Sequence, residues 1–225
     1  MIHKVVKKKW TVGVGSAILT LMLLICCMLF FYSRKKSIST VLVQTPFYTG
    51  QGIVYECDGN EVYIVTAAHI LDGLEEKDSC IVFISQEYQM EAEARYISET
   101  ADVAFLVINL HQNVNDSTDT MQLKAVKMDR AHFDNLKEES PVYAYSYNGL
   151  DRTKIAGSLV SPWIYLEDFN LDMMLAKLPS IQGMSGCGVY DDEGFFVGII
   201  CGSNKEEAAI LPFSIIESEW IMVKD

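Results

Sequence analysis

Two kinds of side chain are missing from the N-terminal part of this 225-residue chain. No acidic residue occurs in residues 1–36, and no charged residue of either sign occurs in residues 10–33. Residues 1–36 hold seven of the 18 basic residues and none of the 30 acidic ones, so the remaining 189 residues hold 11 basic and 30 acidic side chains, a net charge of −19. Because such a surface repels a phosphate backbone, we expect no nucleic-acid partner.

Proline and metal-binding patterns are also scarce. The chain has five prolines, and neither a CxxC nor an HxxxH spacing occurs. Its four histidines lie far apart in the sequence, so the sequence predicts no metal site and no cofactor. With 50% apolar residues overall, the 189 residues after the basic segment can bury a sizeable core, as one large domain or as two small lobes.

Cysteine is limited to six residues. Cys26 and Cys27 lie inside the uncharged segment, and the rest of the chain holds Cys57, Cys80, Cys187 and Cys201. These last four are too few and too scattered for a disulfide scaffold. They allow three pairings, and the sequence does not distinguish any of these pairings from free thiols.

Residues 10–33 are long and apolar enough to cross a membrane. A helix needs about 20 residues to span a hydrocarbon core of about 30 Å, and Trp10 and Tyr32 bracket this segment as interfacial aromatic residues do. A cleaved signal peptide is disfavoured because bulky and basic residues, not a small-residue cleavage site, follow the apolar run. We therefore expect a basic tail (residues 1–9), a transmembrane anchor (10–33) and a linker (34–40).

The basic residues on the two sides of this anchor bear on its orientation. Four lysines and the N-terminal amine precede the anchor, and three basic residues follow it. Positively charged flanks tend to stay in the cytoplasm. We expect a single-pass membrane protein whose N-terminus is cytoplasmic and whose C-terminal domain is extracytoplasmic.

Short strands separated by turns dominate residues 41–225. Residues 52–57 and 61–66 flank Asp58-Gly59-Asn60, a turn sequence typical of a β-hairpin. Residues 88–96 alternate between apolar and polar side chains, as a half-buried strand does. Further strands are expected at residues 103–108, 141–148, 154–159, 172–178, 188–190 and 195–201.

Helical patterns are few in this part of the chain. Residues 68–74 could form one or two turns, and residues 214–223 predict a C-terminal helix with Ser214 at its N-cap. Many short strands followed by one terminal helix indicate an all-β barrel or sandwich, and no repeat of 20–50 residues points to a propeller or solenoid.

Three short segments carry the residue types of acyl-transfer chemistry. His69 lies in VTAAHIL, Asp102 opens the apolar run of ADVAFL, and Ser185 lies between glycines in QGMSGCGV. Each segment alone has an ordinary structural explanation, as a packed histidine, a turn aspartate or a flexible loop. Together they supply a nucleophile, a base and a carboxylate in one chain.

The three residue types complement one another chemically. A serine hydroxyl is a poor nucleophile at neutral pH and needs a base, and histidine suits that task because its ordinary pKa is about 6.5. A carboxylate such as Asp102 would fix the tautomer of the His69 imidazole and stabilise its protonated form. The glycines beside Ser185 allow the N–H groups of Gly183 and Ser185 to point at one spot, where they would bind an oxyanion.

In this order, VTAAHIL, ADVAFLVI and GMSGCGV resemble the trypsin-like (chymotrypsin-fold) serine peptidases. Their compact spacing is most similar to that of the bacterial HtrA-type members, and the resemblance covers residues 47–212. It implies two Greek-key β-barrels, at about residues 41–125 and 126–213, packed face to face with the active site between them. We expect no peptide-binding PDZ module, because the residues after 213 suffice only for the terminal helix.

The resemblance implies a membrane-anchored serine endopeptidase that hydrolyses protein or peptide substrates through an acyl-enzyme. It assigns the catalytic roles to His69, Asp102 and Ser185 and the oxyanion hole to Gly183 and Ser185. It places the substrate-binding pocket at Leu178, Ile181, Cys201, Gly202 and Ser203. No residue expected there is charged, which favours a small or apolar side chain before the scissile bond.

Two alternatives remain from the sequence. Cys187 or Cys201 could be the nucleophile, although relatives with a cysteine nucleophile carry it at the position of Ser185. The domain could also be a catalytically inactive peptidase-like binding or sensing domain tethered to the membrane, because a fold does not guarantee an activity.

Overall fold

The computed structural model describes six stretches of the chain and one isolated residue, Met22. The stretches are residues 38–75, 79–85, 88–110, 123–148, 151–179 and 182–224. Apart from Met22, the predicted tail and transmembrane anchor lie outside the described residues. Within the described residues, no helix combines the length and the apolar character that a membrane span requires. The six stretches all belong to one structural unit, Ile38–Asp225.

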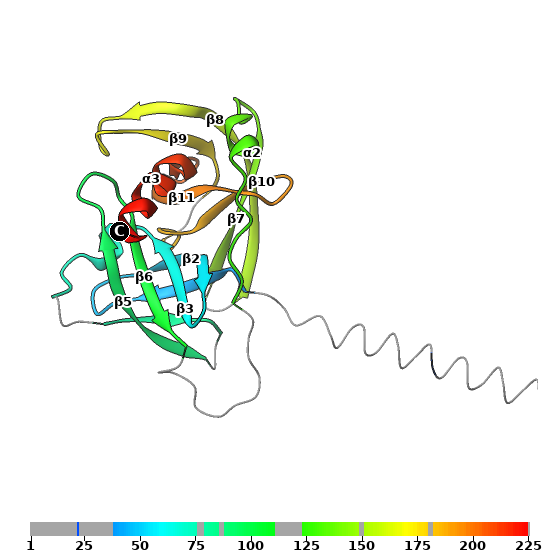
Figure 1. The fold of residues 1–225 in the computed structure, drawn as a ribbon. Helices are drawn as coiled ribbons and strands as arrows, with labels where there is room; N and C mark the ends of the chain where they lie inside the picture. Colours follow the sequence, from blue (N-terminus) through cyan, green and yellow to red (C-terminus); the bar gives the residue numbers. More distant parts are fainter. Residues whose placement is uncertain are drawn as a thin grey trace, which may run out of the picture. The chain divides into compact units, whose positions relative to one another are not determined.

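The first six strands of this unit close into a barrel (Figure 1). They are β1 (Thr40–Gln44), β2 (Thr49–Asp58), β3 (Glu61–Thr66), β4 (Cys80–Phe83), β5 (Gln89–Ile97) and β6 (Ala104–Asn109). Their order around the barrel is β1-β2-β3-β6-β5-β4, with every pair antiparallel. The predicted hairpin joins β2 to β3, and Gly59 takes a positive φ of 57° in its turn.

The next six strands repeat this topology in a second barrel. They are β7 (Pro141–Asn148), β8 (Asp151–Leu166), β9 (Leu171–Lys177), β10 (Gly188–Asp191), β11 (Phe196–Ser203) and β12 (Ala208–Pro212). The order β7-β8-β9-β12-β11-β10 matches that of the first barrel strand for strand. The predicted all-β fold of two barrels followed by a C-terminal helix is therefore confirmed.

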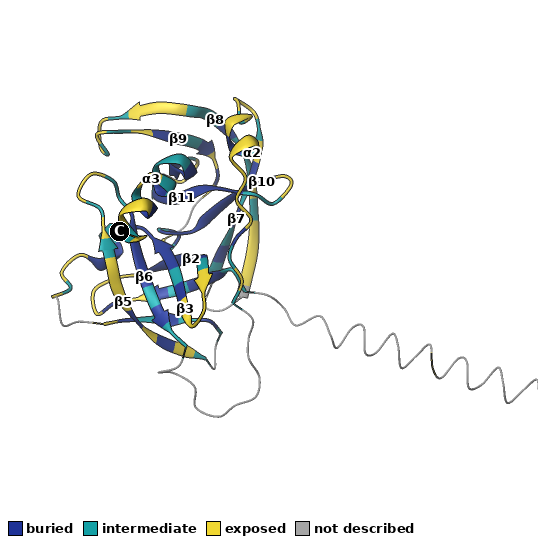
Figure 2. Cartoon of the chain, in the orientation of Figure 1, coloured by how far each residue is buried: buried dark blue, intermediate teal, exposed yellow. Residues whose placement is uncertain are grey.

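Burial follows the strand pattern in both barrels (Figure 2). On β5, Met90 and Ala92 are buried whereas Gln89, Glu91 and Glu93 are exposed, which is the alternation expected of a half-buried strand. The apolar run of β6 is almost wholly buried. The buried aliphatic and aromatic side chains of both barrels form the hydrophobic core.

The C-terminal helix α3 (Phe213–Lys224) lies against both barrels (Figure 1). At its start, Phe213 makes an edge-on ring contact with Phe196 of the second barrel. Two turns further along the helix, Trp220 packs edge-on against Tyr55 and Tyr63 of the first barrel. Because α3 starts at Phe213, Ser214 lies in its first turn, and the prediction of Ser214 as the N-cap was wrong.

Candidate active site

His69 lies on a short 3-10 helix, η1 (Ala68–Leu71), that follows directly on β3. Its ring nitrogen Nδ1 is 2.8 Å from Oδ2 of Asp102, and its main-chain N–H donates to Oδ1 of the same carboxylate at 2.9 Å. One carboxylate therefore fixes both the ring and the backbone of His69. The first two of the predicted catalytic residues are directly bonded although 33 residues separate them in the sequence.

Asp102 lies in the tight turn between β5 and β6. The hydroxyl of Ser98 accepts hydrogen bonds from the N–H groups of Thr100 and Ala101, at 3.2 and 3.1 Å. The N–H of Ser98 donates to the Val103 carbonyl at 3.0 Å and closes the turn. From the second barrel, the Cys201 thiol donates to the main-chain carbonyl of Asp102 at 3.3 Å. The carboxylate is thus presented by a turn that is bonded internally and across the barrels.

The two partners shift each other's pKa. The hydrogen bond that His69 donates to Asp102 raises the pKa of His69 above its ordinary value, although burial acts in the opposite direction. Burial favours the neutral form of Asp102, yet the hydrogen bonds from the His69 ring and main chain together outweigh burial and lower the pKa of the carboxyl. An ionised Asp102 only accepts hydrogen bonds, so Nδ1 of His69 is the donor and Nε2 is left free to take a proton.

Ser185 lies on the loop between β9 and β10 and is half-buried. Gly183 and Gly186 on either side of it take positive φ angles of 90° and 78°, a conformation that side chains disfavour. A Cβ on Gly186 would also collide with the carbonyl oxygen of Gln51. Within the described residues, no hydrogen bond between main-chain groups uses the N–H of Gly183 or of Ser185.

Strand β2 of the first barrel is hydrogen-bonded to this loop. The N–H of Gln51 donates to the Ser185 carbonyl at 2.8 Å, and the Gln51 side-chain amide donates to the Gly183 carbonyl at 3.2 Å. A Cβ on Gly50 would collide with Ile70, the neighbour of His69, and would lie 2.8 Å from the Ser185 carbonyl oxygen. Gly50 therefore lets the backbone of Ser185 approach the segment that carries His69.

Gln51 belongs to no motif in the sequence, and no role was predicted for it. Its side chain is fully buried, which is unusual for glutamine and has its reason in the contacts with the serine loop. The flanking glycines in Gly50-Gln51-Gly52 were the available signal, since glycine within a strand often marks a close approach of two backbones.

The three predicted catalytic residues are thus joined to different degrees. His69 and Asp102 form a hydrogen-bonded pair, whereas no hydrogen bond within the described residues joins the Ser185 hydroxyl to the His69 ring. The loop of Ser185 is held by Gln51 against the segment next to His69. Catalytic hydrogen bonds are often long in unliganded enzymes and tighten only when substrate is bound.

The residues predicted to bind substrate differ in exposure. Leu178 and Cys201 are buried, Gly202 is half-buried and Ser203 is exposed, while Ile181 lies outside the described residues. Gly202 is covered by an aromatic ring, because a Cβ on Gly202 would lie 2.7 Å from Cζ of Phe169. Phe169 comes from the turn between β8 and β9, and its contact with the predicted substrate-binding strand was not predicted from the sequence.

All four cysteines outside the uncharged segment are free thiols. Burial raises the pKa of Cys187 to about 12 and that of Cys201 well above its ordinary value. A thiol of such a high pKa contains almost no thiolate at neutral pH, which argues against either residue as the nucleophile.

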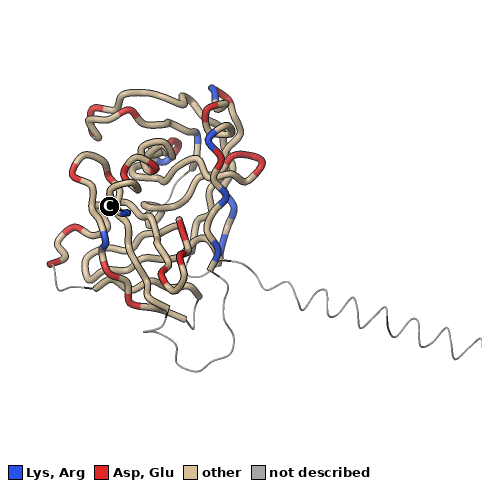
Figure 3. The backbone as a smooth tube through the Cα atoms, in the orientation of Figure 1, with Lys and Arg blue, Asp and Glu red and all other residues tan. Residues whose placement is uncertain are grey.

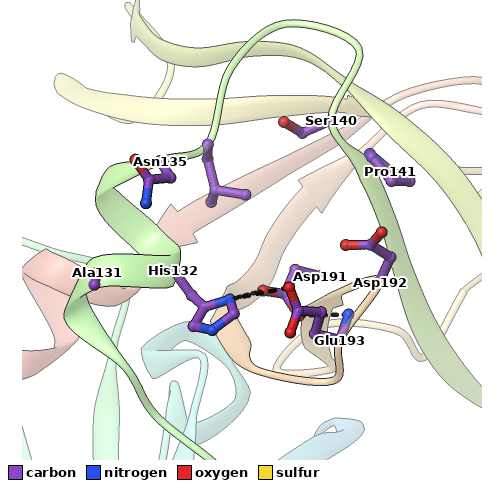
Figure 4. A pocket seen from close by; sticks show the side chains of 9 residues that line it. Ala131, His132, Asn135, Ser140, Pro141, Asp191, Asp192 and Glu193 are labelled. Atoms are coloured by element: carbon purple, nitrogen blue, oxygen red, sulfur yellow. Dashed lines mark hydrogen bonds and ion pairs between the residues drawn. The ribbon is translucent and has the colours of Figure 1, made fainter.

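A second histidine–carboxylate pair lies outside this site, on α2 (Arg130–Asp134) and the β10–β11 hairpin (Figure 4). Nδ1 of His132 is 3.2 Å from Oδ2 of Asp191. The His132 ring stacks on the Phe195 ring, with 3.8 Å between the two ring centroids. The pair borders a cavity of about 290 Å³, and the hairpin forms an acidic loop (Figure 3). Among the described residues, no group of three or more histidine, cysteine or acidic side chains could hold a metal ion.

Comparisons with known proteins agree with this architecture. Among the solved structures with this fold is the active form of the Rv3671c protease from M. tuberculosis, at 16% identity and a TM-score of 0.64, with 86% of this chain and 83% of that chain covered. Deg5 has 19% identity and a TM-score of 0.62, with 82% of this chain and 88% of that chain covered. The HtrA-type protease AlgW with a decapeptide has 16% identity and a TM-score of 0.65, with 84% of this chain and 66% of that chain covered. No curated protein sequence gives a match.

The sequence itself matches the trypsin-like peptidase domain family over residues 50–199, two thirds of the chain. The match contains all three predicted catalytic residues and runs from β2 into β11. The predicted resemblance to trypsin-like peptidases is confirmed, with HtrA-type proteases among the structures of the same fold. The chain belongs to the trypsin-like peptidase domain family.

Proposed function

We propose that this protein is a serine endopeptidase that cleaves protein or peptide substrates through an acyl-enzyme. Ser185 is the nucleophile, His69 is the general base, and Asp102 orients the imidazole. The N–H groups of Gly183 and Ser185 bind the oxyanion. The observation that carries the proposal is the His69–Asp102 pair, in which one carboxylate holds both the ring and the main chain of the histidine.

The direction of the hydrogen bonds supports these roles. Because Asp102 accepts the Nδ1 proton, the neutral ring presents an unprotonated Nε2, which takes the proton of Ser185 as the hydroxyl oxygen attacks the scissile carbonyl. The protonated ring, stabilised by Asp102, then returns the proton to the leaving amine. Water repeats the sequence to release the acyl group from Ser185.

An active-site fluorophosphonate probe tests the proposal on the full chain. Wild type should be labelled covalently, and Ser185→Ala should abolish labelling because the acceptor hydroxyl is gone. Ser140→Ala is the matched control, since Ser140 lies beside the His132–Asp191 pair and its variant should be labelled like wild type. A folded wild-type protein that takes up no label would contradict the proposal and favour a tethered binding or sensing domain.

We also propose that residues 10–33 anchor the peptidase in a membrane, with the N-terminus in the cytoplasm and the peptidase domain outside. The 24-residue uncharged segment with basic flanks supports this proposal. The full chain should stay with membranes after alkaline carbonate extraction, and protease added to intact cells should degrade the peptidase domain. Release by carbonate would contradict the anchor, and resistance to protease would contradict the orientation.

A further inference from the structure

We propose that Glu219 of the C-terminal helix is a positioning residue for Asp102. This inference deepens the proposed function, on which it rests. It assigns to α3 a role in holding the turn that presents the orienting carboxylate, in addition to its role in packing.

Glu219 joins α3 to the Asp102 turn through both carboxylate oxygens. Oε2 accepts a hydrogen bond of 2.7 Å from the hydroxyl of Tyr96, and Oε1 accepts one of 3.3 Å from the hydroxyl of Thr100. The bond from Tyr96 raises the pKa of that phenol. Tyr96 lies at the end of β5 and Thr100 in the turn itself, so a single side chain of α3 contacts the turn at two points.

The turn transmits this contact to Asp102 over a short distance. Thr100 donates its N–H to the Ser98 hydroxyl, and Ala101 donates to the same oxygen. Asp102 follows directly, and its carboxylate holds the ring of His69. A shift of Thr100 therefore moves the backbone from which the Asp102 side chain extends.

The helix itself is a fixed platform for Glu219. The adjacent Trp220 is buried and packs against Tyr55, Tyr63 and Phe105 of the first barrel. Phe213 and Ile216 are also buried, two turns and one turn before Trp220 on the same face of the helix. Because these three buried side chains fix α3 against the barrels, the carboxylate of Glu219 has a defined place to which the turn can be bonded.

The effect of Glu219 acts through geometry rather than through its charge. The charged groups that shift the pKa of His69 are Asp102 and Asp72, and Glu219 is not among the causes of the shift at either His69 or Asp102. A neutral side chain that still accepts a hydrogen bond should therefore preserve part of the function. Glutamine keeps one accepting oxygen, whereas alanine keeps none.

The experiment compares Glu219→Ala and Glu219→Gln in the full chain with the matched control Glu217→Ala. Glu217 lies on the same helix, but its carboxylate forms a 2.8 Å ion pair with Arg130 and not with a residue of the Asp102 turn. Two quantities are measured: kcat/KM as a function of pH, and the titration midpoint of the His69 ring by NMR in a Ser185→Ala background. The NMR titration needs no turnover.

Glu219→Ala should lower kcat/KM about tenfold and move the His69 midpoint to lower pH, because a displaced Asp102 holds the protonated ring less well. Glu219→Gln should fall between Glu219→Ala and wild type, and Glu217→Ala should match wild type in both quantities. Thr100→Val, which removes only the hydroxyl on the turn, should shift the midpoint in the same direction as Glu219→Ala.

Separate outcomes identify which proposal fails. A Glu219→Ala protein with a lower melting temperature but a wild-type His69 midpoint would overturn the positioning role. Should Glu219→Ala not fold, a wild-type midpoint in Thr100→Val would overturn it equally. If wild type cleaves nothing while the midpoint still moves, the peptidase proposal fails and the positioning of Asp102 by Glu219 stands.

Discussion

The described part of the chain contains two histidine–aspartate pairs, His69–Asp102 and His132–Asp191, and they differ in what surrounds the histidine. Nδ1 of His69 is 2.8 Å from Oδ2 of Asp102, and Nδ1 of His132 is 3.2 Å from Oδ2 of Asp191, so the two pairs have similar distances. The ring of His132 is stacked on Phe195, whereas the loop that carries Ser185 packs against the segment next to His69.

The second oxygen of each carboxylate explains the difference. Oδ1 of Asp102 accepts the main-chain N–H of His69 and so fixes the histidine itself. Oδ1 of Asp191 instead accepts the N–H groups of Glu193 and Phe195, at 3.0 and 2.8 Å, and so fixes its own hairpin turn. A histidine–aspartate pair is therefore insufficient evidence for a catalytic base, and the assignment depends on which backbone the carboxylate holds.

The largest expected difference between the pairs concerns the histidines. His69→Gln should lower kcat/KM by about 10⁶-fold because the base that activates Ser185 is lost. His132→Gln should keep kcat/KM within about twofold of wild type, since the ion pairs of His132 in the described part of the chain are with Asp191 and Glu193. Steady-state kinetics on a peptide substrate measure both. Equal losses in the two variants would break the distinction drawn between the pairs.

The aspartates should show a smaller contrast in the same direction. Asp102→Asn should lower kcat/KM by about 10⁴-fold, because an amide in place of the carboxylate favours the wrong tautomer of His69. Asp191→Asn keeps a carbonyl oxygen for the hairpin N–H groups and should leave kcat/KM within about threefold. An Asp102→Asn protein that retains full activity would show that this carboxylate does not orient the base.

Most of the fold could be predicted because its signals are local. The Asp58-Gly59-Asn60 turn and the alternation along β5 each lie within ten residues, and both predicted the observed structure. The strand expected at residues 154–159 was too short, since β8 runs from Asp151 to Leu166. Register shifts between Leu159 and Ser161 and between Ser161 and Ile164 interrupt the pairing of β8 with β9 from the residue at which the predicted strand ended.

The supporting residues of the site could not be predicted for the opposite reason. Gln51 contacts Gly183 across 132 residues of sequence, and Thr100 contacts Glu219 across 119. Glutamine and glutamate at these positions carry no motif, and their roles follow only from the barrels being closed and packed together. The prediction of His69, Asp102 and Ser185 rested on their chemistry, which a short segment does reveal.

The Asp191 carboxylate should contribute to the stability of the fold rather than to activity. Asp191→Ala removes the acceptor of two main-chain N–H groups and the partner of His132, which should cost about 1–3 kcal/mol. Asp192→Ala, at the exposed neighbouring position, should change the free energy of unfolding by less than about 0.5 kcal/mol. Urea denaturation measures both, and a neutral Asp191→Ala would show that the hairpin does not depend on its carboxylate.

The smallest expected effect is a shift in the pH profile of catalysis. The base must be neutral to accept a proton, so kcat/KM falls as pH drops through the pKa of His69. Because the hydrogen bond to Asp102 raises that pKa, the acidic limb of the wild-type profile should have its midpoint above the ordinary histidine value of about 6.5. In Asp102→Asn the residual activity should show a midpoint at lower pH, whereas Asp191→Asn should leave the midpoint in place.

The same raised pKa also affects stability. Protonated His69 stabilises the fold at low pH, and this contribution is lost as pH rises through the folded-state pKa of His69, whereas activity rises over the same range. A common midpoint in wild type and Asp102→Asn would mean that the 2.8 Å contact does not control the protonation of the base.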